Sequence, residues 1–276
     1  MAWTRHSALV RGASWIVVLG GLMALVPACA GKKRQNEVVG TLSAGEAYRQ
    51  ALAEIELRNL RKARSLLERV QYSGEEREEL EPKVRMAIAD ATYYQSYAIA
   101  LIDARALYLD FVTLYGQHPR APYAQFQAGM CSLAQARHSS RDQSQTRLAI
   151  TDLREVLRRY PNSSFAGAAG GMIRQAQQKL AEHEVVIGRF YMKRRKPLAA
   201  VERFRNVLER YPSYPEKDKL YFYLGQALLR SNNDAEARIY LDKLVTDYPD
   251  GQYFNEAIKQ LDKAGGRLKL DLPESQ

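Results

Sequence analysis

Apolar residues recur along this chain in one fixed helical register. In each copy an alanine is followed four, seven and eight positions later by bulky apolar residues, and eleven positions later by a tyrosine. These offsets place the five side chains on one face of an α-helix. The copies begin at Ala104, Ala149, Ala200 and Ala237. The pattern predicts amphipathic helices that present equivalent faces to their neighbours.

A residue that ends helices follows the tyrosine in every copy: Pro161, Pro212, Pro249 or, in the first copy, Gly116. Another apolar stripe precedes each copy, which predicts two helices per unit. Residues 221–249 also follow the tetratricopeptide signature, an aromatic residue and Leu-Gly followed by an alanine and a proline. We therefore expect an all-α fold, a tetratricopeptide-repeat solenoid of about five helical hairpins in which each hairpin packs on its neighbours.

Residues 1–28 have the composition of an export signal. Arg5 and Arg11 precede an apolar stretch over 13–26, which is too short for an ordinary membrane-spanning helix. The following residues, Val26-Pro27-Ala28-Cys29, resemble the lipobox of bacterial lipoproteins, so we expect lipidation of Cys29. The alternative is ordinary signal cleavage beside a chance cysteine. Two or three acyl chains on one cysteine would hold the protein on a membrane essentially permanently.

The remaining chain divides by composition into three parts. Residues 29–40 are polar and form the expected lipidated, flexible tether, with a basic triplet at 32–34 that lies over lipid head groups or is simply solvated. The tetratricopeptide domain is expected over 41–264, with Ser43 or Thr41 as the cap of its first helix. Residues 265–276 form a polar tail.

The formal net charge of +10 bears on the kind of partner and not on the predicted fold. Loss of the leader removes two of these charges, and a moderate basic excess remains, with four consecutive cations over Lys193–Lys196. No aromatic residues interleave with these cations, and an exported protein seldom meets nucleic acid. We expect an acidic protein surface as the partner and no nucleic acid.

Catalytic and metal-binding patterns are missing from the sequence. His183-Glu184 begins like a metalloprotease helix, but Ile187 stands where the second histidine would be. No serine elbow, cysteine–histidine signature or phosphate loop is found. Cys131 lies among apolar residues and is expected to be a buried helix residue. We therefore predict a protein that is not an enzyme and has no metal and no cofactor beyond the covalent lipid on Cys29.

The order of features is similar to that of the BamD family of outer-membrane assembly lipoproteins. The lipobox cysteine and the repeats come with a set of short segments in the same order, at 114–119, 141–147, 180–184 and 190–191. The resemblance covers residues 29–262. It implies a lipid-anchored protein on the periplasmic face of a Gram-negative outer membrane. It also implies a non-enzymatic scaffold that binds the barrel-forming subunit BamA, companion lipoproteins and unfolded β-barrel substrates.

The resemblance further implies two functional halves. The C-terminal half, about 138–264, would face BamA and would use Arg203 and, on the turn before it, Arg194. The N-terminal half, about 41–137, would hold substrate in a groove. Residues Tyr48, Tyr93, Tyr97 and Tyr108 are expected to line it. Phenol rings supply apolar area with a polar tip, which suits amphipathic strands.

A second interpretation shares the anchor and the repeats. Other tetratricopeptide lipoproteins act as pilotins for secretins or as cell-envelope coordinators. The segment Arg141–Arg147 favours the BamD family over these.

Overall fold

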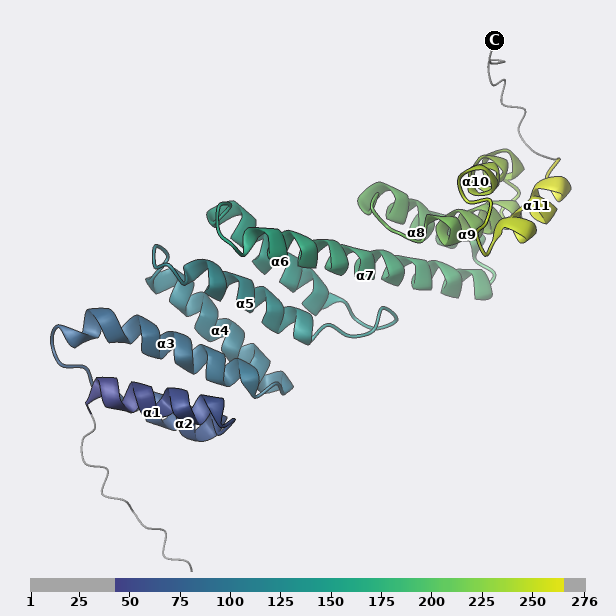
Figure 1. Ribbon diagram of the computed structural model, residues 1–276. Coiled ribbons are helices and arrows are strands. Elements are labelled where there is room, and N and C mark those ends of the chain that lie inside the picture. The colour runs from purple at the N-terminus through teal and green to yellow at the C-terminus, as the bar shows by residue number, and fades with distance from the viewer. Residues whose placement is uncertain (1–42, 266–276) are drawn as a thin grey trace, which may run out of the picture. The chain divides into compact units, whose positions relative to one another are not determined.

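The computed structural model describes residues 43–265 as a stack of α-helices, and within this range there is no strand. The expected leader, Cys29 and the tether lie outside the described residues, as does the tail beyond position 265. Eleven helices make up the described part (Figure 1): α1 Ala44–Glu56, α2 Leu60–Leu67, α3 Glu76–Tyr94, α4 Ala98–Leu114, α5 Ala121–Ala134, α6 Ser144–Arg159, α7 Ala166–Lys193, α8 Pro197–Arg210, α9 Lys217–Arg230, α10 Asp234–Asp247 and α11 Phe254–Lys263.

Each helix packs against the next one in the chain, so the helices form five successive hairpins from α1–α2 to α9–α10, and α11 follows them on α10. The predicted all-α fold of about five hairpins is confirmed. The long helix α7 has 28 residues and contacts α6 as well as α8. Position 138, where we expected the functional halves to meet, falls in the loop between α5 and α6.

The ends of the helices follow from local sequence. Ser43 caps α1 in a capping box: its Oγ accepts from the Glu46 amide at 3.3 Å, and the Glu46 carboxylate accepts from the Ser43 amide at 3.1 Å. The repeated tyrosine is the C-cap residue of α4, α6, α8 and α10. The proline or glycine behind it cannot continue the helix favourably.

The recurring register forms the core. All four alanines are fully buried, and the residues four and seven positions later are at most 1% exposed. The exposure of the residue at +8 differs between copies: Val112 and Val245 are buried, whereas Leu157 is 38% exposed. The tyrosines at +11 are half-buried. The pattern therefore identified the buried face of the second helix in each hairpin.

Glycines on the first helices allow this face to approach closely. A Cβ at Gly129 or at Gly225 would lie 2.6 Å from the side chain of Leu153 or Leu241, the residue at +4 in the paired helix. A Cβ at Gly188 would overlap the ring of Phe204, which occupies the same register position. Only glycine fits at this contact without displacing a buried side chain.

Candidate partner-binding surfaces

The turn between α7 and α8 is strongly basic and exposed. Its four cations, Lys193, Arg194, Arg195 and Lys196, all lie on the surface, and none forms an ion pair within residues 43–265. The Arg194 guanidinium lies 5.3 Å from the centre of the Phe190 ring. Phe190 is 51% exposed and Leu198, in the first turn of α8, is 70% exposed. This turn offers both cations and apolar area to a partner.

Arg203 is held in place by an acid of its own chain. Its Nη1 lies 3.1 Å from Oε2 of Glu184 on α7, and 39% of the arginine side chain remains exposed. The hydrogen bond to Glu184 raises the pKa of the Arg203 guanidinium. Arg203 is thus a partly exposed cation in a fixed position on α8, about two turns from the start of that helix.

A partly buried polar cluster joins α7 to the α8–α9 loop and to α9. The Glu182 carboxylate accepts from the Tyr214 hydroxyl at 2.5 Å and from Lys219 Nζ at 3.0 Å. The Lys219 side chain is only 14% exposed. Burial and the Glu182 carboxylate raise the pKa of Tyr214. Nothing in the sequence pattern indicated this cluster, because Glu182 lies more than 30 residues from both of its partners.

Tyr108 does not line a groove, so that prediction is wrong. Its side chain is fully buried, and its hydroxyl donates to Oδ1 of Asp90 at 2.7 Å. The Tyr123 hydroxyl donates to the same oxygen at 2.8 Å. Burial raises the pKa of Tyr108 far above its usual range. Tyr108 occupies the +4 position of the repeat register, and this explains its role as a core residue.

The other three tyrosines are not gathered into one site. Tyr48 is half-buried on α1 against the first core cluster, around Ala51 and Leu67. Tyr93 is half-buried on α3, with its ring 6.5 Å from the Tyr108 ring. Tyr97 lies on the turn before α4 and is 56% exposed.

Tyr97 also lines a hollow that sequence reasoning missed. The hollow has a volume of about 480 Å³ and lies between the α1–α2 hairpin and the α3–α4 turn. Its lining residues are Arg58, Leu60, Arg61, Gln95 and Tyr97. Arg58 has a positive φ of 61° and places its guanidinium 5.3 Å from the centre of the Tyr94 ring. The two arginines make this hollow suitable for an anion.

Comparison with known proteins settles the family. Residues 41–239 match the family model described as "YfiO: Outer membrane lipoprotein". The chain belongs to this family. Its curated relatives carry the name outer membrane protein assembly factor BamD. One from Caulobacter vibrioides is 33% identical over 175 residues, which are 63% of this chain and 56% of that protein. One from Rickettsia prowazekii is 24% identical over 88% of this chain and 92% of that protein.

Two solved structures are similar more distantly. The complex of the TPR2AB domain of yeast Sti1 with pHSP90 has a TM-score of 0.40 at 14% identity, and the match covers 80% of this chain and 89% of that one. A thermophilic tetratricopeptide protein of Thermus thermophilus has a TM-score of 0.32 at 14% identity, covering 79% and 99%. In the part of the chain that the structure describes, no helix combines the length and apolar composition needed to cross a membrane.

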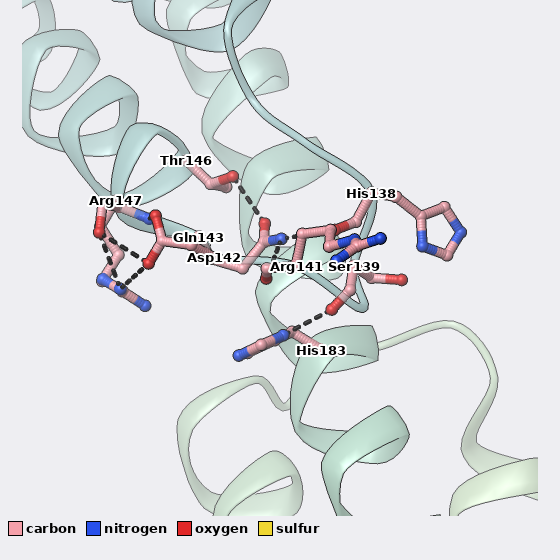
Figure 2. A network of polar contacts seen from close by, with 9 residues as sticks. His138, Ser139, Arg141, Asp142, Gln143, Thr146, Arg147 and His183 are labelled. Carbon is pink, nitrogen blue, oxygen red and sulfur yellow. Dashed lines mark hydrogen bonds and ion pairs between the residues drawn. The ribbon is translucent and has the colours of Figure 1, made fainter.

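One of the segments on which the resemblance to BamD rests is fixed by a polar network in the α5–α6 loop (Figure 2). The buried Gln143 side chain donates to the carbonyls of His138 and Arg141 at 2.9 and 3.0 Å, and accepts from the Thr146 hydroxyl at 2.8 Å. Asp142 accepts from the amide and the hydroxyl of Ser144, which lowers the pKa of its carboxyl. The segment therefore folds on itself at the start of α6.

The same loop is attached to the long helix α7. His183 Nδ1 lies 2.5 Å from the Ser139 carbonyl (Figure 2). Lys179 Nζ donates to the Ala136 carbonyl at 3.0 Å. A carbonyl oxygen only accepts, so Nδ1 carries the proton in this contact. His183, which the sequence showed only as half of an incomplete metal motif, is a structural residue that fixes the loop to α7.

Proposed function

We propose that this chain is a non-enzymatic scaffold in the assembly of outer-membrane β-barrel proteins, held on the periplasmic face of the outer membrane by lipid on Cys29. The observation that carries the proposal is the family match over most of the helical domain. The names of the relatives support it. The chain spans just over half the length of the Caulobacter relative and most of the Rickettsia one, so its partners and substrates form part of the proposal.

In this proposal the C-terminal half binds the barrel-forming subunit BamA. Arg194 is exposed on the α7–α8 turn and Arg203 is partly exposed on α8, where Glu184 of α7 holds it in position. An acidic surface on the partner would pair with Arg194 directly. It would share Arg203 with Glu184. Charge pairs of this kind favour fast association and a defined orientation.

The N-terminal half binds unfolded substrate in the same proposal. Tyr48 and Tyr93 lie on α1 and α3, the first helices of neighbouring hairpins, and each exposes part of its ring. A photo-crosslinking residue at either position is expected to capture an unfolded β-barrel protein. Crosslinks that form only from Tyr160, which is half-buried on the loop after α6, would contradict this placement.

Co-purification from solubilised membranes tests the partner. The double variant Arg194→Glu with Arg203→Glu is expected to lose BamA by about tenfold, because two attractive pairs become repulsive. The matched control is Arg154→Glu with Arg158→Glu, which changes the charge equally on the exposed face of α6. Equal recovery of BamA with both double variants would contradict the assignment of Arg194 and Arg203 as BamA-binding residues. Recovery of a secretin or a peptidoglycan enzyme by the native chain would favour a pilotin or cell-envelope coordinator instead.

A further inference from the structure

The two sets of turns in this helical stack differ in charge. Consecutive helices pack as hairpins, so turns within hairpins lie at one end of the helices and turns between hairpins lie at the other (Figure 1). Turns within hairpins contain six arginine or lysine residues and one acid, Asp142. Turns between hairpins contain two arginines and four acids. One edge of the described stack is therefore basic and the opposite edge is slightly acidic.

In the first two hairpins the basic edge also exposes large apolar side chains. Leu57 on the α1–α2 turn is 69% exposed, and Tyr97 and Ile99 at the start of α4 are 56% and 67% exposed. Arg58, on the same edge, contributes an exposed cation. We call the residues 57–61, 95–99 and 135–142 the turn edge. Apolar tips beside cations are the composition of surfaces that lie in a membrane interface.

Among the four helices of the register, only α4 carries apolar residues both five and two positions before the alanine, whereas α8 carries Arg195 and the exposed Leu198 there. Relative to the register alanine, Ile99 and Ile102 stand five and two positions before Ala104. The residues at the same positions in α6 are Ser144 and Arg147. The repeat fold itself does not require apolar residues there, because α6 forms the same packing with polar ones.

Two hollows separate the turns of this edge. The one between Arg58, Arg61 and Tyr97 has a volume of about 480 Å³. The second, of about 400 Å³, lies between the start of α4 and the α5–α6 loop; both Arg137 and Asp142 line it, so its charge is balanced. Guanidinium groups bind phosphate oxygens in pairs of hydrogen bonds. The first hollow thus combines two phosphate-binding side chains with a tyrosine at its rim.

We infer that the turn edge rests on the head-group layer of an anionic phospholipid bilayer. The inference rests on the proposed anchor at Cys29, from which 13 residues lead to Ser43. Such a segment reaches about 45 Å when extended. Helix α1 is about 20 Å long, so the α1–α2 turn lies within reach of the lipid plane. Tethering raises the effective concentration of lipid at this edge, so individually weak contacts suffice.

The test uses tryptophan as a local reporter. Both tryptophans of the sequence, Trp3 and Trp15, lie in the expected leader, so Tyr97→Trp creates the sole tryptophan of the mature chain. Leu114→Trp is the matched control, since Leu114 is 58% exposed at the opposite end of the same helix. The lipidated chain is placed alone in vesicles of phosphatidylglycerol and brominated phosphatidylcholine. We expect blue-shifted emission and roughly twofold stronger quenching for the Tyr97→Trp chain than for the Leu114→Trp chain.

Charge reversal completes the experiment. Arg58→Glu with Arg61→Glu in the Tyr97→Trp chain is expected to abolish the extra quenching, whereas Arg154→Glu with Arg158→Glu is expected to leave it. Equal quenching at positions 97 and 114 overturns the inference. The inference is also overturned if the emission at position 97 shifts only after an acidic protein is added, because the turn edge would then be a protein-binding surface. A chain that does not float with the vesicles overturns the anchor as well. A failure to bind BamA in the co-purification affects the proposed function only.

Discussion

At the scale of single residues, one contact sets how closely the two helices of a hairpin approach: the contact between a glycine of the first helix and the +4 side chain of the second. Gly225→Ala would place a Cβ 2.6 Å from buried Leu241. We expect a loss of about 1–3 kcal/mol in the free energy of unfolding, because the core must shift to admit the methyl group. Gly171→Ala in α7 is the control: its nearest neighbour is a flexible Arg174 nitrogen at 3.9 Å. It should gain up to about 1 kcal/mol from helix propensity. Urea unfolding measures both, and equal shifts of the same sign would contradict the packing argument.

The thiol of Cys131 gives a prediction about pH. It is fully buried on α5, and burial raises its pKa to about 12 from an ordinary value of 9.0. At pH 8 the thiolate is therefore about a thousandfold rarer than in an unfolded chain. Because the pKa of the thiol is higher in the folded protein than in the unfolded chain, its contribution to the free energy of unfolding keeps its full value below pH 9. It falls as the pH rises from 9 toward 12, where the unfolded chain loses the proton more readily. Mass spectrometry of the Cys131 peptide after maleimide labelling should show modification only in denaturant. Rapid labelling of the native protein would show that the thiol is accessible.

At the scale of elements, the α5–α6 loop depends on α7. His183→Ala removes the donor to the Ser139 carbonyl and should cost about 1 kcal/mol. Hydrogen exchange is expected to quicken in residues 136–143 while α9 and α10 remain protected. His138→Ala is the control, since that exposed ring bonds to Ser140 within the loop and not to α7. If both variants exchange alike, the loop does not depend on its attachment to α7.

At the scale of the whole molecule, the helical domain and the membrane attachment are separable. Replacing residues 1–28 by a leader for ordinary signal peptidase, together with Cys29→Ser, should leave the helical circular-dichroism spectrum unchanged. The core is formed by residues between 44 and 261, which this change does not touch. The variant should be released from membranes by a carbonate wash, because the lipid supplies most of the binding free energy. Retention in the membrane fraction would show that contacts of the folded domain suffice.

The sequence by itself determined the repeated register, and through it the fold class and the buried face of each second helix. A helix has a fixed period, so the offsets of alanine, apolar residues and tyrosine specify one face without knowledge of the partner. The register already places Tyr108 on this face, four positions after Ala104, so the prediction that Tyr108 lines a groove conflicted with the repeat pattern and is wrong. An aromatic residue at +4 belongs to the packing frame, and its hydroxyl meets Asp90 on another helix.

Only the tertiary structure decided which side chains from distant positions meet. The Arg58–Arg61 hollow, the Glu182 cluster and the attachment of Ser139 to His183 each join separate helices or turns, and their members show no common spacing along the chain. Such contacts depend on the angle and the rise between neighbouring hairpins, and these follow from how whole helices pack. The charge difference between the two sets of turns depends on both the sequence and the tertiary structure. The charged residues can be identified from the sequence, but the antiparallel packing of the helices places them at opposite edges.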